Sequence, residues 1–185
     1  MALDAARHTA RPDSSPSPGR LPKPVNSPDP PTPLDPQAAA ALLARAREAS
    51  RHAYAPYSRF PVGAALLTED GEVFAGCNVE NASFGLTICA ERVALQKAVS
   101  EGRRRFRAIA VMGPEDDVPL APCGSCRQVL YEFGADMAVV MASGTGGEPA
   151  VTSLRTLLPG AFESERLHRD HAPNRGTAPD QGKEK

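Results

Sequence analysis

The sequence predicts an α/β fold in which helices cover a central sheet. Short apolar runs, typical of buried strands, alternate along the chain with longer segments whose apolar residues recur at helical spacing. Two helix–strand units follow each other between Ile88 and Met141, which predicts that their two strands lie parallel as neighbours. Asp70-Gly71 joins two further apolar runs, and an Asp-Gly pair in that position predicts a hairpin.

The individual elements are predicted from these signals in chain order. Asp35 is a favoured N-cap residue and Pro36 suits the first helical position, so the first helix is predicted over 36–52. Later helices are predicted where apolar residues recur three and four apart, and strands where a short apolar run stands alone. The remaining predictions are strands over 62–68 and 72–77, a polar loop over 78–87, a helix over 90–99, a strand over 106–112, a loop over 113–122, a helix over 126–133, a strand over 137–141 and a short helix over 153–158.

Composition predicts one folded domain with loose ends within the 185 residues. Ten of the 19 prolines fall within the first 36 residues, and all nine Phe and Tyr residues lie between Tyr54 and Phe162. Pro-rich or charged segments without large apolar side chains cannot offset the entropy of ordering. We therefore expect a disordered Pro-rich tail over 1–35, a folded domain over 36–162 and a disordered charged tail over 163–185.

The charge balance argues against nucleic acid and membrane partners. The chain has 21 basic and 22 acidic residues, so it lacks the positive surplus that binding a phosphate backbone usually requires. No apolar run approaches the 18 or so residues of a membrane span, and none follows the first charges as in a secretory signal. We expect a cytoplasmic protein, in which the four cysteines are ligands or buried thiols rather than disulfides.

Two cysteine motifs carry the strongest chemical signal. One is Cys89-Ala90-Glu91 and the other is Pro122-Cys123-Gly124-Ser125-Cys126, and each stands where a loop meets a predicted helix. Cys123 and Cys126 are three residues apart, so on one helical turn their sulfurs face the same way. Together with Cys89 they would bind a metal through three thiolates and leave the fourth tetrahedral position open, as in a catalytic zinc site. A chance pattern, a redox pair and a structural zinc knuckle are the alternatives.

Charged neighbours of these motifs indicate how such a centre could work. Glu91 follows Cys89 by two residues, which on a helix turns its side chain about 160° away. It is therefore placed to flank a molecule held by the metal, as a general base, rather than to bind the metal. Helix N-termini stabilise thiolates, and Arg92 and Arg127 could compensate further charge or be solvated helix residues. Cys77 ends a predicted strand and is expected to be a small core residue.

These motifs and several others in the same order resemble the zinc-dependent cytidine deaminases of the small homotetrameric kind. The likeness extends from about Tyr54 to Phe162, which is nearly the whole predicted domain. The Pro-Cys-x-x-Cys signature and the glutamate that is not a ligand belong to this deaminase chemistry. The matching blocks are 57–64 (YSRFPVGA), 76–83 (GCNVENAS), 87–92 (TICAER), 121–128 (APCGSCRQ) and 157–162 (LLPGAF).

The resemblance implies a fold, a cofactor and a reaction. The fold would be a three-layer α/β/α sandwich with a central mixed sheet of about five strands. Cys89, Cys123 and Cys126 would bind one zinc per subunit of a homotetramer. Glu91 would carry protons while a zinc-bound hydroxide attacks C4 of cytidine, or of 2′-deoxycytidine. The products would be uridine, or its deoxy form, and ammonia, in pyrimidine salvage.

The resemblance also implies which residues bind the substrate. Asn78 and Glu80 match the pair that binds a ribose hydroxyl, and residues two apart on an extended segment face the same side. Phe60 matches the aromatic residue that packs on the pyrimidine, with plain core packing as its alternative. Phe162 matches the residue that reaches a neighbouring subunit's pocket, with plain interface packing as its alternative. Ala90 is the fifth expected substrate contact.

Three other functions remain open at this point. They are deamination of a base inside RNA or DNA, deamination of a cytosine-bearing antibiotic nucleoside, and metal-stabilised binding without catalysis. Polymer-acting relatives commonly use His-x-Glu where this chain has Cys89-Ala90-Glu91. The basic stretch 103–107 is the best candidate for contact with nucleic acid, but a solvated turn between helix and strand is the favoured interpretation.

Overall fold

The structure is a computed structural model that describes residues 34–114 and 118–163. The predicted tails over 1–35 and 163–185 lie outside the described residues, except for 34, 35 and 163. The acidic stretch 115–117 of the predicted 113–122 loop lies outside them as well. Within the described part of the chain, no helix combines the length and apolarity needed to cross a membrane.

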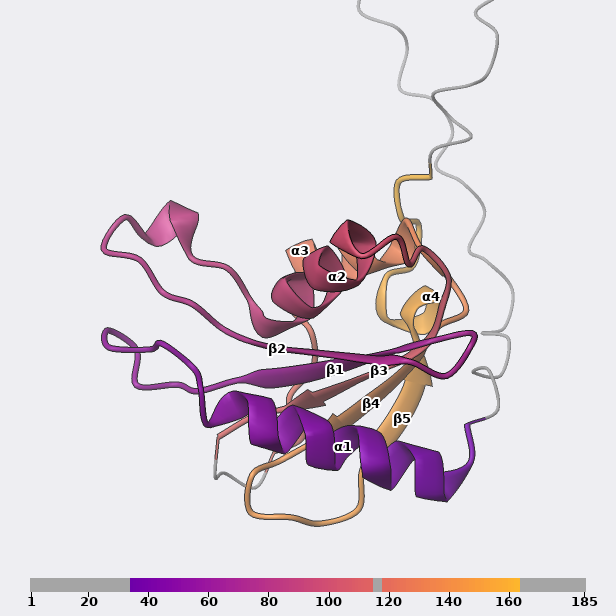
Figure 1. Cartoon of the computed structure of the whole chain (residues 1–185), viewed down its shortest axis with the longest axis horizontal. Helices are drawn as coiled ribbons and strands as arrows, with labels where there is room; N and C mark the ends of the chain where they lie inside the picture. Colours follow the sequence, from indigo (N-terminus) through magenta and orange to yellow (C-terminus); the bar gives the residue numbers. More distant parts are fainter. Residues whose placement is uncertain (1–33, 115–117, 164–185) are drawn as a thin grey trace, which may run out of the picture.

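A five-stranded mixed sheet forms the centre of the molecule (Figure 1). Its order is β2-β1-β3-β4-β5, in which only β3 and β4 are parallel. The predicted hairpin is the antiparallel pair β1–β2, and the two predicted parallel neighbours are β3 and β4, so both predictions are confirmed. The strands are β1 (Gly63–Thr68), β2 (Val73–Cys77), β3 (Phe106–Met112), β4 (Ala138–Ala142) and β5 (Ala150–Ser153).

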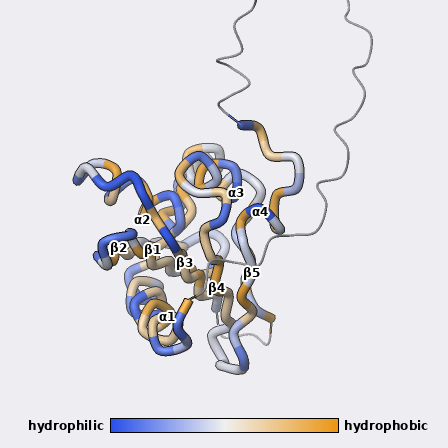
Figure 2. Tube along the Cα trace, turned by 90° about the vertical axis from the view of Figure 1, so that its right-hand side faces the viewer, coloured by the Kyte–Doolittle hydropathy of each residue, from blue (hydrophilic) through white to orange (hydrophobic). Residues whose placement is uncertain are grey.

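Helices cover both faces of this sheet and complete the predicted three-layer α/β/α sandwich. Helix α1 (Pro36–Ser50) lies alone on one face, whereas α2 (Ala90–Ser100), α3 (Gly124–Tyr131) and α4 (Leu154–Leu157) lie on the other. Figure 2 shows the same separation from the side, with the sheet between the two helical layers. A short 3-10 turn, η1 (Phe84–Leu86), interrupts the long loop between β2 and α2.

Two apolar cores form because side chains alternate along each strand. On β3, Ile109 and Val111 face the core beneath α2, α3 and α4, whereas Ala108 and Ala110 face α1. Small residues also let a helix approach a strand closely. A Cβ atom on Gly76 of β2 would lie 2.7 Å from the carbonyl oxygen of Ala90, so this glycine allows the first turn of α2 to rest directly on the strand.

Three local predictions differ from the structure. Strand β5 was absent from the elements predicted by pattern, because it is four residues long and largely exposed, so it lacks an apolar run. Helix α3 begins two residues before the predicted 126, because Cys123 is its N-cap and apolar spacing starts only later. Cys77 is half-buried rather than a core residue, because β2 is an edge strand.

Candidate active site

The three cysteines predicted as ligands meet at the N-termini of two helices. Cys89 is the N-cap residue of α2, and Cys123 is the N-cap residue of α3. Cys126 lies in the first turn of α3, and α2 packs against α3. The first N–H groups of a helix have no partner within it, and the helix dipole places partial positive charge there. Two helix ends therefore favour thiolates at the same point.

The sulfur atoms have a spacing that fits a zinc ion. The three Sγ atoms lie within 4.8 Å of one another, and Sγ of Cys89 and Sγ of Cys123 are 3.9 Å apart. Tetrahedral zinc with Zn–S bonds of about 2.3 Å separates its sulfur ligands by about 3.8 Å. All four cysteines are free thiols, and among the described residues this trio is the one group of three or more metal-ligating side chains so closely placed.

The cysteines differ in how readily they ionise. The pKa of Cys89 is lowered to about 5, first because the Cys126 thiol donates a hydrogen bond to it, and then because Arg92 and Cys123 do so. The pKa of Cys126 is raised, because its thiol is the donor to Cys89 and because it is buried. The metal-free site therefore holds a thiolate at Cys89, and metal binding has to displace the Cys126 proton.

The contribution of Cys89 to the stability of the metal-free protein is expected to increase as the pH rises from about 5 toward 9.0, the ordinary pKa of a thiol. Between these values the unfolded chain keeps a proton on Cys89 that the folded chain has released. The resulting stability is complete above the unfolded pKa and is lost as the pH falls through about 5. Thermal unfolding of metal-free wild type and Cys89→Ala measures the effect, and identical pH slopes would contradict it.

Glu91 is buried beside the sulfur atoms but does not belong to the three-cysteine cluster. Its side chain is on the first turn of α2, and the residue is only 4% exposed. Burial raises the pKa of Glu91, repulsion from the Cys89 thiolate raises it further, and a hydrogen bond with Cys126 lowers it in part. A carboxyl group with a raised pKa is a stronger base and keeps its proton to higher pH, which suits general acid–base chemistry.

The two arginines that follow the motifs occupy different positions. Nη2 of Arg92 lies 3.6 Å from Sγ of Cys89 and donates to the carbonyl oxygen of Thr87 at 3.2 Å. Arg127 instead donates to the carbonyl oxygens of Pro122, at 2.7 Å, and Leu157, at 2.9 Å. Arg92 therefore lies at the thiolate, whereas Arg127 connects the loop before Cys123 to the end of α4.

Asn78 and Glu80 both contact the segment 57–62. The Asn78 side chain accepts a hydrogen bond from the main-chain N–H of Val62 at 2.8 Å and donates to the carbonyl oxygen of Phe60 at 2.9 Å. The Glu80 carboxylate accepts bonds from the N–H groups of Tyr57 and Ser58 and from the Ser58 hydroxyl. A carboxylate has about four acceptor positions, so Glu80 retains capacity for one further donor.

The three remaining residues that were predicted to contact the substrate lie in different surroundings. Ala90 is fully buried under β2, and the Phe60 side chain is partly exposed, at 39%. Phe162 is 55% exposed, and its main chain pairs with the side chain of Gln128 through bonds of 2.8 and 3.2 Å. Gln128 thus holds the main chain of Phe162 in place.

Sequence reasoning assigned no role to Ser58 or Gln128. Both stand inside motif blocks, but their side-chain partners Glu80 and Phe162 lie 22 and 34 residues away along the chain. Local spacing cannot indicate such contacts, because neither pair belongs to one helix or one strand. Membership of a matching block was the one available signal.

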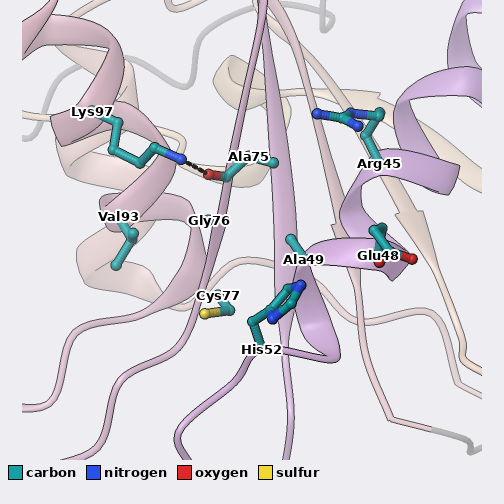
Figure 3. A pocket seen from close by; sticks show the side chains of 9 residues that line it. All are labelled: Arg45, Glu48, Ala49, His52, Ala75, Gly76, Cys77, Val93 and Lys97. Atoms are coloured by element: carbon teal, nitrogen blue, oxygen red, sulfur yellow. Dashed lines mark hydrogen bonds between the residues drawn. The ribbon is translucent and has the colours of Figure 1, made fainter.

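A separate cavity of about 320 Å³ lies between α1, β2 and α2, and none of the predicted site residues lines it. Figure 3 shows Arg45, His52, Cys77 and Lys97 around this cavity. The Lys97 ammonium group donates to the carbonyl oxygen of Ala75 at 2.7 Å. Cys77 is therefore outside the sulfur cluster, and the cavity is distinct from the candidate metal centre.

An α/β/α sandwich that brings three thiol groups to two helix N-termini, beside a buried carboxyl group, has the arrangement of a zinc-dependent deaminase. Comparison with known proteins leads to the same class. The sequence profile of the cytidine and deoxycytidylate deaminase zinc-binding region matches residues 36–142. The chain therefore belongs to the cytidine and deoxycytidylate deaminase family, which confirms the resemblance found in the sequence.

Individual relatives match over most of their length. The cytidine deaminase of Halalkalibacterium halodurans is 52% identical over 128 residues, covering 69% of this chain and 96% of that protein. The cytidine deaminase of Sporosarcina psychrophila is 48% identical over 126 residues, covering 68% of this chain and 92% of that protein. A crystal structure of cytidine deaminase from Burkholderia pseudomallei matches with a TM-score of 0.64 at 55% identity, over 66% of this chain and 98% of the other.

Proposed function

We propose that this protein hydrolytically deaminates cytidine and 2′-deoxycytidine to the corresponding uridines and ammonia, as a step of pyrimidine salvage in the cytoplasm. The observation that carries the proposal is the three-cysteine cluster with the buried Glu91 beside it, in a chain of this family. The names of the relatives, which are cytidine deaminases, support the choice of substrate.

Cys89, Cys123 and Cys126 hold one zinc ion per chain in this proposal. Their mutual spacing and their soft sulfur donors support zinc as the metal. When bound, zinc lowers the pKa of water from 15.7 toward about 7 and so supplies a nucleophile at neutral pH. Arg92 compensates part of the negative charge of the thiolates, a role supported by its contact with Cys89.

Glu91 moves the protons of the reaction. Its carboxylate accepts a proton from the attacking water and delivers it to N3 of the cytosine ring. Protonation at N3 makes C4 more electrophilic, so that the C4–O bond can form. Glu91 then takes the remaining proton from the new C4 hydroxyl group and delivers it to the amino group, so that the C4–N bond breaks, ammonia leaves and the C4 carbonyl of the product forms. The raised pKa of Glu91 supports this role, because the same group has to bind and release a proton within one turnover.

The substrate is held by residues on the segment 57–62 and on the strand-to-helix loop. Phe60 packs on the pyrimidine ring, and Ala90 contacts the base at the start of α2. Asn78 and Glu80 bind a ribose hydroxyl, which is supported by the acceptor position left on Glu80 and the second amide N–H of Asn78.

The protein assembles into a homotetramer in this proposal, and Phe162 reaches into the pocket of a neighbouring subunit. The loop that contains Tyr57 and the loop that contains Phe84 project from the same end of the sheet (Figure 1), and both have exposed apolar side chains. They meet through the rings of Tyr57 and Phe84, and Phe84 and Leu86 are 73% and 65% exposed. Exposed apolar groups of this size mark interaction surfaces. Monomers detected by light scattering at micromolar concentration would contradict the assembly.

Nucleic acid is not the substrate in this proposal, and two ion pairs support its exclusion. Arg103 forms an ion pair with Glu72 at 2.6 Å, and Arg105 forms one with Glu69 at 3.1 Å. Two arginines of the basic stretch 103–107 are thus already paired with acids of the β1–β2 hairpin.

An antibiotic nucleoside would need the same metal centre as cytidine. A binding module without catalysis would retain zinc and deaminate no substrate.

Purified protein incubated with cytidine and followed by ultraviolet absorbance tests the proposed function, with zinc measured on the same sample. We expect loss of cytidine, release of one ammonia for each uridine formed, and about one zinc per chain. 2′,3′-Dideoxycytidine is the matched control, because it lacks the 2′ and 3′ hydroxyls and keeps the 5′ hydroxyl; losing a hydrogen bond to a charged group should lower kcat/KM about 10- to 100-fold. Zinc without turnover of cytidine would identify a binding module instead.

A further inference from the structure

The loop that carries Phe60 is held in an unfavourable backbone conformation. Arg59 has a φ of 56°, and it is the one residue other than glycine with a positive φ among the described residues. Left-handed backbone is unfavourable for a side chain with a Cβ atom, and it persists where surrounding contacts impose it. Such positions occur disproportionately at binding sites, so the contacts that impose this one are informative.

Ser58 connects these contacts to the proposed substrate site. Its hydroxyl donates to Oε1 of Glu80, and its N–H donates to Oε2 at 3.2 Å. The same hydroxyl oxygen accepts a hydrogen bond from the main-chain N–H of Phe60 at 3.0 Å. The carbonyl oxygen of Phe60 is held in turn by the Asn78 side chain at 2.9 Å. The N–H group and the carbonyl oxygen of Phe60 are therefore both held by side chains of other residues.

We propose that Ser58 is a positioning residue: its hydroxyl links the Glu80 carboxylate to the main chain of Phe60 and so aligns the two proposed substrate contacts. The inference rests on the proposed function, in which Glu80 binds the ribose and Phe60 the base. Without the hydroxyl, one oxygen of Glu80 and the N–H of Phe60 lose their partner together. The left-handed turn at Arg59 then has fewer contacts to maintain it, and both substrate contacts lose their fixed positions.

Kinetics of Ser58→Ala test the proposal against a plain structural role. We expect KM for cytidine to rise about tenfold, the effect of one lost hydrogen bond to a charged group, while kcat stays within about twofold. Ser58→Thr keeps a hydroxyl and should restore most of the affinity. Ser100→Ala is the matched control, because it also removes a serine hydroxyl; that hydroxyl donates to the main-chain carbonyl of Lys97 on α2, away from the 57–62 segment. An unchanged KM in Ser58→Ala would overturn the proposal.

A double-mutant cycle with Glu80→Ala tests whether Ser58 acts through Glu80. If it does, KM of the double variant stays within about twofold of the KM of Glu80→Ala alone. If the two substitutions instead raised KM by factors that multiply in the double variant, the proposal that Ser58 acts through Glu80 would be wrong.

Hydrogen exchange at the amide of Phe60 gives a readout that needs no turnover. Exchange should be faster in Ser58→Ala than in wild type and unchanged in Ser100→Ala. If wild type failed to deaminate cytidine, the proposed function would be wrong, and exchange at Phe60 would still decide whether the Ser58 link exists.

Discussion

Glu91→Gln is expected to lower kcat for cytidine by at least about 10²–10⁴ while the zinc content stays at the wild-type value. The amide has nearly the same shape as the carboxyl group, but it cannot carry a proton from water to the ring. Removing a buried charge beside the Cys89 thiolate also removes repulsion, so the variant should unfold at a temperature equal to or above that of wild type. Steady-state kinetics, zinc analysis and thermal unfolding measure the three quantities.

Glu101→Gln is the matched control for this substitution. Glu101 is the C-cap residue of the same helix, α2, and it is exposed at the end opposite the cysteine cluster. The control should retain wild-type kinetics and zinc. A Glu91→Gln protein that deaminated cytidine at the wild-type rate would refute the assigned proton transfer, whereas one that lost zinc would show that Glu91 supports the metal.

Replacing Cys89, Cys123 or Cys126 by Ala is expected to reduce bound zinc to less than about one tenth of the wild-type amount and to abolish measurable deamination. Each variant leaves two sulfur ligands, and two ligands cannot complete a site that has three protein donors and one open position. Zinc analysis after gel filtration, combined with the cytidine assay, measures both losses.

Cys77→Ala is the control for these three variants, because Cys77 is a free thiol that lines the cavity between α1, β2 and α2 instead of joining the cluster. It should keep both zinc and activity. Removal of zinc from wild type by a chelator should abolish activity, and added zinc should restore it. Full activity in a cluster variant, or loss of zinc in Cys77→Ala, would contradict the ligand assignment.

Most of the fold was predictable because its elements have strong local signals. The helix α1 begins at Pro36, as its capping residues predict, and β3 spans Phe106–Met112, as its apolar run predicts. The edge strand β5 has no such run, because an edge strand buries little apolar surface. Its pairing with β4 depends on the chain returning beside that strand, which no short window of sequence contains.

The candidate site divides in the same way. Spacing within a motif indicated that Cys123 and Cys126 could share one ion, and the structure places their sulfurs together with that of Cys89. Spacing did not distinguish the two arginines, yet Arg92 lies at the Cys89 thiolate and Arg127 binds main-chain carbonyls elsewhere. The direction of a long side chain depends on what packs around it, and that is set by several elements at once.

By itself the sequence determined the α/β class and the chemical groups that a deaminase needs, because both depend on residue type and on short spacing, and the resemblance of its motif blocks indicated the family. Only the tertiary structure decided that Ser58 joins Glu80 to Phe60 and that Gln128 holds the main chain of Phe162. Contacts between residues more than twenty positions apart form only when the sheet and its helices pack. The geometry of these contacts is therefore set by the packing of the whole domain.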